Sequence, residues 1–293
     1  MINYSIIIPH FNAKELLDRC INSIPKRNDI QIIIVDDYSS EDIYHSILEK
    51  YNLLENIEIY QNEKNLGAGF SRNYGINKAL GKWLIFSDCD DYFTENAFSF
   101  FDSFVNTDNE IIYFDSVINN KVNMKKIQDK CSKNINKYLT GKNKKLIKTN
   151  NWEPWGKMFS TVFIKKNKIV FHPVIAMNDA FFTIRASLLA KKIDMSLNQV
   201  YVYVIYQNSI SRQKSIEKSS ARLQEILQIN KEILSHKGFV LYTIDIFLPI
   251  LNFLRDFGMK NITKLYKIFR INGFYIGIPF YSLLQKIERN LLQ

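Results

Sequence analysis

The chain has 293 residues, and a hydrophobic share of 46% excludes a disordered polymer. Its 39 Lys and Arg residues against 29 Asp and Glu residues give a net charge of +10, which favours an anionic partner such as a nucleotide, a nucleic acid or an acidic membrane. Three cysteines without metal-type spacing argue against a disulfide framework and favour a reducing compartment. Residues 1–9 lack the basic segment of a secretory signal, so we expect a cytoplasmic location.

The first half of the chain alternates strand patterns with helix patterns. Apolar, β-branched runs predict strands at residues 4–8, 32–35, 57–60, 83–86 and 110–114. Apolar residues at helical spacing predict helices over residues 16–24, 43–51 and 68–80, and another from about residue 94. This alternation predicts an α/β fold with a mainly parallel sheet flanked by helices.

Polar residues follow three of these strands directly, at residues 10–12, 36–39 and 88–91. Because ligands of parallel sheets bind beyond the carboxyl ends of the strands, we expect these segments to lie around one site. The last segment, DCDD, places three acids within four residues, a pattern that becomes favourable when it binds a hard cation such as Mg²⁺ or Mn²⁺. The alternative is a solvated turn that caps the next helix.

The segment GAGFSRNYG at residues 67–75 adds a cation between two of the strands. Its glycines allow close backbone approach, and Arg72 is a candidate for binding a diphosphate or bracing the acids at 88–91. An ordinary surface ion pair is the alternative for Arg72. The spacing is not that of a phosphate loop, and no GxGxxG follows the first strand, so a dinucleotide-binding fold is not expected.

Four motifs, in this order, resemble the bacterial family 2 glycosyltransferases: SIIIPHFN at residues 5–12, IVDDYSS at 34–40, NLG at 65–67 with SRNYG at 71–75, and DCDD at 88–91. The resemblance implies the Rossmann-like GT-A fold and a nucleotide-sugar donor, which we expect to be UDP-linked. It also implies an essential divalent metal, Mg²⁺ or Mn²⁺, and transfer of a sugar, expected to be a hexose, with inversion.

The resemblance assigns Pro9, Phe11, Asn12, Asp37, Arg72 and Asp88 to the donor, and Asp90 and Asp91 to the metal. The first two would form part of the base pocket, with Asp37 as the partner of the base ring. Asp88 would lie near the ribose and diphosphate, and one of the two metal-binding acids would be the direct ligand. Phe11 stands where a Tyr is common, which keeps ring stacking and removes a hydroxyl.

Two segments of the second half extend the resemblance. WEPWGKMF at residues 152–159 contains a WxK-type segment, and its indoles either belong to the core or stack on sugar rings. AMNDAFF at residues 176–182 is similar to the family's ED segment, which makes Asp179 the candidate catalytic base, although Asp179 also suits a helix N-cap. The residues expected at the acceptor are Trp152, Trp155, Lys157 and Asn178, the last of which stands where Glu is common.

The resemblance ends at about residue 212. Apolar residues at helical spacing predict an amphipathic helix over residues 216–234, and residues 239–293 are aromatic, apolar and net basic. The apolar stretch at 239–254 is shorter than the roughly 20 residues of a membrane-spanning helix. This region either lies on an anionic membrane surface or packs on the catalytic domain or on a second copy of the chain.

We therefore expect a GT-A catalytic domain over residues 1–212 and a C-terminal helical region over residues 213–293. Residues 1–115 would bind the nucleotide sugar, and residues 116–212 would bind the acceptor. The expected function is an inverting glycosyltransferase that moves a sugar to a hydroxyl of a glycan or lipid-linked glycan in bacterial surface polysaccharide synthesis. It would act in the cytoplasm, or on the inner face of the cytoplasmic membrane if the C-terminal region binds lipid.

Two other function classes remain open on the sequence alone. A nucleotidyltransferase would share the sheet and the acids, and would release pyrophosphate from a nucleoside triphosphate. A noncatalytic protein that binds anionic lipid or nucleic acid would explain the charge. Nucleic acid is not expected, because no RNP-like aromatic strand, helix-turn-helix pattern or zinc spacing accompanies the Lys-rich run at residues 121–148.

Overall fold

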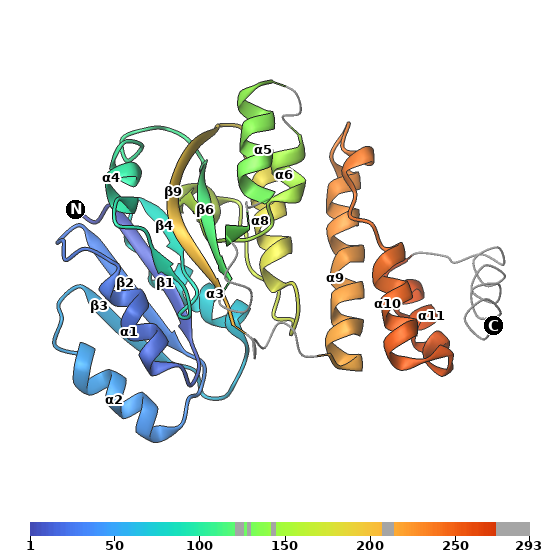
Figure 1. The fold of residues 1–293 in the computed structure, drawn as a ribbon, viewed down its shortest axis with the longest axis horizontal. Coiled ribbons are helices and arrows are strands. Elements are labelled where there is room, and N and C mark those ends of the chain that lie inside the picture. Colours follow the sequence, from blue (N-terminus) through green and yellow to red (C-terminus); the bar gives the residue numbers. More distant parts are fainter. Residues whose placement is uncertain (121–125, 128–129, 142–144, 207–213, 274–293) are drawn as a thin grey trace. The chain divides into compact units, whose positions relative to one another are not determined.

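The computed structural model describes residues 1–120, 126–127, 130–141, 145–206 and 214–273 (Figure 1). The chain divides into two compact units, unit 1 with Met1–Val174 and Asn178–Ser209, and unit 2 with Ile175–Met177 and Ile210–Gln293. The predicted domain boundary at residue 212 lies outside the described residues and stays a prediction. In the part of the chain that is described, no helix has the length and apolar character needed to cross a membrane.

Unit 1 is built around one sheet. Its described strands are β1 (Tyr4–His10), β2 (Ile30–Asp36), β3 (Ile57–Gln61), β4 (Trp83–Phe86), β5 (Tyr92–Phe93), β6 (Ile111–Asn120), β7 (Lys126–Ile127), β8 (Lys157–Ser160) and β9 (Ile193–Ile205). They run in the order β3-β2-β1-β4-β8-β6-β9-β5, with β7 paired to β6. Strands β3, β2, β1 and β4 are mutually parallel, as are β6 and β9, whereas β5, β7 and β8 pair antiparallel. Because most paired positions are parallel, the predicted mainly parallel α/β sheet is confirmed.

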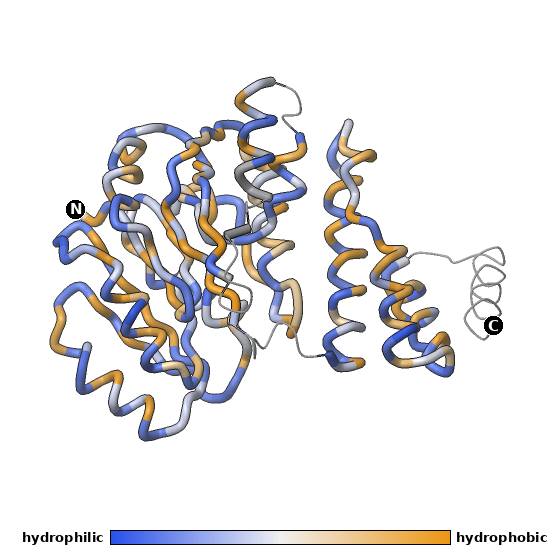
Figure 2. Tube along the Cα trace, in the orientation of Figure 1, coloured by the Kyte–Doolittle hydropathy of each residue, from blue (hydrophilic) through white to orange (hydrophobic). Residues whose placement is uncertain are grey.

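Helices cover both faces of this sheet. The described helices of unit 1 are α1 (Lys14–Asn22), α2 (Glu41–Tyr51), α3 (Ala68–Lys78), α4 (Ala97–Asp102), α5 (Lys130–Leu139), α6 (Leu146–Asn150), α7 (Thr161–Lys166) and α8 (Asn178–Leu189). Successive strand residues face opposite sides, so Ile6 packs with Leu17 of α1 in one hydrophobic cluster, and Ile7 packs with Ile76 of α3 in another. Every residue of β1 and β2 is buried, which explains their continuous apolar pattern (Figure 2).

Two glycines allow α3 to lie very close to its neighbours. A Cβ at Gly75 would lie 2.5 Å from Cγ2 of Ile7 on β1, a separation that packed side chains do not reach. A Cβ at Gly69 would lie 2.7 Å from the main-chain oxygen of His172, in the segment that leads to α8. These contacts place α3, and with it Arg72, against both the central strand and the start of α8.

Unit 2 is helical and has a hydrophobic core of its own. Its described helices are α9 (Ile216–Ser235), η2 (Val240–Tyr242), α10 (Phe247–Phe257), η3 (Met259–Asn261) and α11 (Ile262–Ile271). Ser215 caps α9, because its Oγ accepts a hydrogen bond from the main-chain nitrogen of Lys218 at 3.1 Å. The buried core consists of Leu223, Leu227, Ile250, Phe253, Leu254, Leu265, Ile268 and Phe269. The predicted C-terminal helical extension is therefore confirmed.

Candidate functional site

Three carboxylates come together in the acid turn, residues 87–91, which follows β4 at the carboxyl edge of the sheet. One oxygen from each of Asp88, Asp90 and Asp91 lies within 4.8 Å of the other two. Asp91 is fully buried, and Asp88 and Asp90 are half-buried. Burial first, and the charge of Asp88 next, raise the pKa of Asp90 to about 6 and that of Asp91 well above its usual range. A divalent cation would offset this repulsion, and an all-carboxylate set suits Mg²⁺ or Mn²⁺.

Arg72 of α3 connects the acid turn to the beginning of α8. Its Nη2 donates a hydrogen bond to Oδ1 of Asp88 at 2.5 Å, and its Nη1 donates to Oδ1 of Asn178 at 3.1 Å. The Arg72 side chain is only 6% exposed, and its guanidinium lies 5.3 Å from the ring centroid of Phe171. This cation is therefore fixed between two segments of the site and is not an ordinary surface ion pair.

Asp179 lies in the first turn of α8, next to Asn178. Its Oδ1 accepts a hydrogen bond from the main-chain nitrogen of Ala180 at 3.0 Å. Burial raises the pKa of Asp179, the charge of Arg72 opposes this rise, and the charge of Asp88 adds to it. A carboxylate with a raised pKa is, once ionised, a stronger base than an exposed one. The role of Asp179 as the base stays a prediction.

The segments that follow β1 and β2 lie side by side. Asn12 donates from its main-chain nitrogen to Oγ of Ser39 at 2.8 Å, and its Oδ1 accepts from the main-chain nitrogen of Ser40 at 2.9 Å. Asn12 has a φ of 48°, a left-handed conformation that Asn tolerates better than most residues. Pro9 is buried within β1, whereas the Phe11 ring is 41% exposed. Of these residues, Phe11 offers the open aromatic surface.

Asp37 organises the loop that precedes α3. Its Oδ1 accepts hydrogen bonds from the main-chain nitrogen of Leu66 and from Nδ2 of Asn62, both at 2.8 Å, and its Oδ2 accepts from the main-chain nitrogen of Gly67 at 2.7 Å. The Asp37 residue is 4% exposed. The structure therefore shows a carboxylate that holds residues 62–67. The role of Asp37 beside the base ring stays a prediction.

His10 and Asp36 form a buried pair that supports both loops. Nδ1 of His10 lies 2.7 Å from Oδ1 of Asp36, and the main-chain nitrogen of Ala13 donates to Nε2 of His10 at 3.1 Å. Since Nε2 accepts, the proton resides on Nδ1, which donates to Asp36. Burial works against the charge of Asp36, but hydrogen bonds from His10 and Ser39 hold its pKa below the usual value. The sequence places His10 at the edge of the sheet without revealing this partner.

Arg19 contacts the acid turn, a contact that the sequence does not predict. From α1, its Nη2 donates to the main-chain oxygen of Asp90, and its Nη1 donates to the hydroxyl of Tyr206 at 2.7 Å. The guanidinium also lies 5.0 Å from the ring centroid of Tyr92. Only the fold brings α1 to the acid turn, and a single Arg on an amphipathic helix carries no signal of such a contact.

The residues predicted at the acceptor have different environments. The Trp155 ring is stacked between Tyr201 and Tyr203 of β9, with centroid distances of 5.2 and 5.4 Å and interplanar angles of 11° and 13°. Lys157, which begins β8, is 1% exposed, and its Nζ donates to the main-chain oxygen of Glu153 at 2.5 Å. Trp155 and Lys157 therefore belong to the interior of unit 1, whereas Trp152 and Asn178 are half-buried.

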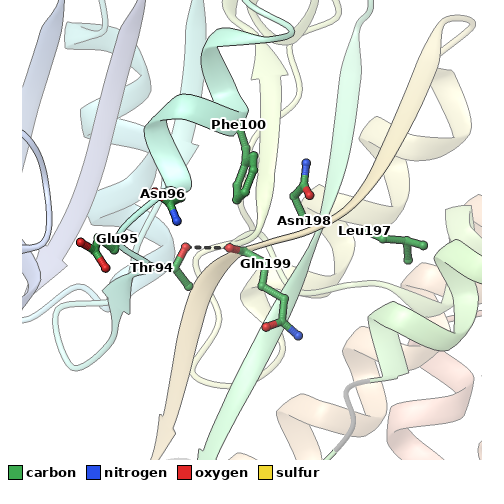
Figure 3. A pocket seen from close by; sticks show the side chains of 7 residues that line it. All are labelled: Thr94, Glu95, Asn96, Phe100, Leu197, Asn198 and Gln199. Atoms are coloured by element: carbon green, nitrogen blue, oxygen red, sulfur yellow. Dashed lines mark hydrogen bonds between the residues drawn. The ribbon is translucent and has the colours of Figure 1, made fainter.

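A shallow hollow lies beside the end of β5 (Figure 3). It is lined by Thr94, Glu95, Asn96, Phe100, Leu197, Asn198 and Gln199, and the Thr94 hydroxyl donates to the main-chain oxygen of Gln199 at 2.6 Å. None of the acids of the acid turn contributes to its lining, and Glu95 is its only carboxylate. This hollow is therefore separate from the carboxylate cluster.

The model of glycosyl transferase family 2 matches residues 5–168, which include the acid turn, Arg72 and both polar loops. The chain belongs to this family. Among curated relatives, the poly(ribitol-phosphate) beta-glucosyltransferase of Bacillus spizizenii is 30% identical over 210 residues, covering 69% of this chain and 32% of that protein. The poly(ribitol-phosphate) beta-N-acetylglucosaminyltransferase TarS of Staphylococcus aureus is 26% identical over 209 residues, covering 69% of this chain and 35% of TarS. This family 2 chain thus spans about a third of the length of these relatives.

Solved structures confirm the GT-A fold of this family 2 glycosyltransferase. Residues 1–349 of S. aureus TarS in complex with UDP-GlcNAc match with a TM-score of 0.68 and 22% identity, covering 90% of this chain and 76% of that one. The mannosyltransferase PcManGT of Pyrobaculum calidifontis, in complex with GDP-Man and Mn²⁺, matches with a TM-score of 0.56 and 12% identity, covering 99% of this chain and 81% of that one. At these identities the likeness establishes the fold.

Proposed function

We propose that this chain transfers a sugar, with inversion, from a UDP-linked donor to a hydroxyl of a glycan or lipid-linked glycan in the synthesis of a bacterial surface polysaccharide. The observation that carries the proposal is the arrangement around Arg72, which joins the carboxylate cluster at Asp88 to the α8 start that holds Asp179. The names of the relatives support a glycopolymer acceptor, and the UDP-GlcNAc complex of TarS supports a UDP-linked donor.

In this proposal the donor lies across the carboxyl edge of the sheet. The exposed ring of Phe11 stacks on the base, and Pro9, Asn12 and Asp37 shape the loops around it. Asp88 and Arg72 lie at the ribose and diphosphate. Mg²⁺ or Mn²⁺, when bound at Asp90, neutralises charge on the diphosphate leaving group.

The chemical step requires a base on the acceptor side. Asp179 removes the proton of the acceptor hydroxyl as its oxygen attacks the anomeric carbon, and the bond from that carbon to the diphosphate breaks. A single displacement of this kind inverts the configuration at the anomeric carbon. Asn178 keeps Arg72 in place, and Trp152 is the indole proposed to contact the acceptor, because Trp155 is buried against two tyrosines.

A panel of sugar nucleotides tests the donor half before any acceptor is known. We expect one UDP-sugar to raise the melting temperature in the presence of Mn²⁺, and to be slowly hydrolysed, with both effects lost on chelation. The matched control is the same sugar linked to GDP or CDP. Stabilisation by no sugar nucleotide, or hydrolysis that persists in excess chelator, would contradict the proposal.

For unit 2 we propose association with an anionic membrane surface at the cytoplasmic side. Lys267 and Arg270 are exposed on α11, next to the exposed apolar side chains of Tyr266 and Ile271. Cationic and apolar groups on one short helix fit a surface of anionic lipid. Packing of this unit on a second copy of the chain is the competing arrangement, and vesicle flotation together with solution mass separates the two.

A further inference from the structure

Two residues of β9 hold the acid turn: Tyr201 through its buried hydroxyl, and Val204 through its main-chain nitrogen. The main-chain nitrogen of Asp88 donates to the hydroxyl of Tyr201 at 2.9 Å, and that hydroxyl donates to Oδ2 of Asp91 at 2.8 Å. The turn also closes on itself, because the main-chain nitrogen of Asp91 donates to the main-chain oxygen of Asp88 at 3.1 Å. Tyr201 is therefore the link between the first and last acids of the turn.

Asp91 is oriented toward the protein interior. Its second oxygen, Oδ1, accepts a hydrogen bond from the main-chain nitrogen of Val204 at 2.8 Å, so both carboxylate oxygens have partners on β9. Asp91 is 0% exposed, whereas Asp88 and Asp90 are half-buried. A divalent ion that keeps waters and diphosphate oxygens in its coordination shell needs ligands at the surface of the site.

The ring of Tyr201 is itself held in place. It is fully buried, and the Trp155 indole stacks on it at a centroid distance of 5.2 Å with an interplanar angle of 11°. Phe93 packs against it edge-on at 5.6 Å. A hydroxyl on a ring that is fixed on two sides has little freedom to move, so it defines the position of the turn.

We propose that Tyr201 and Asp91 form a positioning pair that fixes the acid turn, and that the metal ligands are Asp90 and Asp88 and not Asp91. The pair sets the distance between Asp88 and Asp90, and thereby the affinity for the divalent ion. This inference rests on the proposed metal-dependent function and deepens it. It also gives Trp155 a role, since the indole supports the ring of Tyr201.

The test measures Mn²⁺ binding to the full chain by electron paramagnetic resonance of free Mn²⁺, with UDP present and no sugar donor. Tyr201→Phe keeps the ring and its stacking but removes the hydrogen bonds of the hydroxyl with Asp88, Asp91 and, at 3.4 Å, Ser87. Partners behind metal ligands typically change affinity by about 10- to 100-fold. We expect a weakening in that range. Asp91→Asn keeps groups that can bond Tyr201 and Val204, so its affinity should stay within about tenfold of wild type, whereas Asp90→Asn should lose more than about 100-fold.

The matched control is Tyr4→Phe. Tyr4 is also fully buried, and its hydroxyl also donates to a carboxylate oxygen, Oδ1 of Asp102, at 2.8 Å. It lies at the amino end of β1, away from the acid turn, so its loss should lower the melting temperature as Tyr201→Phe does and leave Mn²⁺ affinity unchanged. Thermal unfolding of each variant separates loss of fold from loss of the ion.

Three results would overturn the inference. Wild-type affinity in Tyr201→Phe removes Tyr201 from the positioning role. A loss of Mn²⁺ affinity in Asp91→Asn as large as the loss in Asp90→Asn makes Asp91 a direct ligand. This conclusion stands even if Tyr201→Phe fails to fold. Absence of Mn²⁺ binding by the wild type refutes the metal-dependent function as well, whereas the first two results leave that function intact.

Discussion

The guanidinium of Arg72 and the carboxylate of Asp88 form an ion pair at 2.5 Å, in which the Arg72 side chain is buried and lies over the ring of Phe171. The same guanidinium also holds Asn178, the residue before the proposed base Asp179, and so it links the acid turn to that base. The planar guanidinium can donate hydrogen bonds to both partners at once, whereas a buried Lys ammonium cannot reproduce that geometry.

Arg72→Lys is therefore expected to reduce sugar transfer strongly while preserving the charge. A misplacement of about 1 Å at a catalytic site can cost on the order of 100-fold in rate, which is the size of effect we expect on kcat. Steady-state transfer assays would measure it. Lys78→Gln, an exposed change on the same helix, is the control and should stay near wild type. Equal activity of Arg72→Lys and wild type would argue that the link has no catalytic importance.

Asp179→Asn tests the base directly. Asn has the same size, and its amide oxygen can still accept the hydrogen bond from the main-chain nitrogen of Ala180, but it cannot take a proton. General base catalysis contributes about 10²- to 10⁴-fold, so transfer should fall by that factor while donor affinity, measured by calorimetry with UDP-sugar, changes little. A parallel loss of donor affinity would instead assign Asp179 a structural role, and near-normal transfer would place the base elsewhere.

Metal binding should depend on pH through Asp90. The pKa of this carboxyl is raised to about 6 in the folded protein from a usual value of 3.8, so its contribution to stability is full below about pH 4 and is lost as the pH rises through 6. The carboxyl of Asp90 ionises over the same pH range and thereby becomes a metal ligand. The stabilisation of the protein by Mn²⁺ should therefore grow between pH 5 and pH 7. Melting temperatures with and without Mn²⁺ measure this difference, and in Asp90→Asn the growth attributable to Asp90 should disappear.

Close packing of α3 on β1 leads to a prediction about stability. Gly75→Ala places a methyl group where the nearest atom of Ile7 is 2.5 Å away, and overpacking of this kind typically costs about 1–3 kcal/mol. Asn77→Ala, at an exposed position of the same helix, should change the free energy of unfolding by less than about 0.5 kcal/mol. Denaturant titrations of both variants would measure these values. A Gly75→Ala protein as stable as the control would show that α3 can shift without cost.

The central strands and the acid turn were predictable because their signals are local. The buried run from Tyr4 and the polar residues after each strand follow from composition and from the rule that sites lie at carboxyl ends. Strand β8 was not predicted, because its insertion between β4 and β6 depends on pairing with residues far away in the sequence. Trp155, expected at the acceptor, stacks on two tyrosines of β9 that are distant in the sequence. Arg19 and Tyr201 were missed for the same reason, since their partners are set by the fold alone.

Unit 2 is expected to bind anionic membranes through the basic residues of α11. Each basic residue near an anionic surface contributes about 1 kcal/mol, so removing the charges of Lys264, Lys267 and Arg270 should weaken vesicle binding by about 3 kcal/mol, and reversing them to Glu by more. Flotation with anionic vesicles at low salt should show wild type bound and the triple variant free, while transfer to a soluble acceptor survives because the chemistry lies in unit 1.

Neutral vesicles are the lipid control. Phe253→Ala, which removes a buried ring from the helical core, controls for loss of fold. If unit 2 instead packs on a second copy, the charge variant will keep its solution mass and wild type will not float.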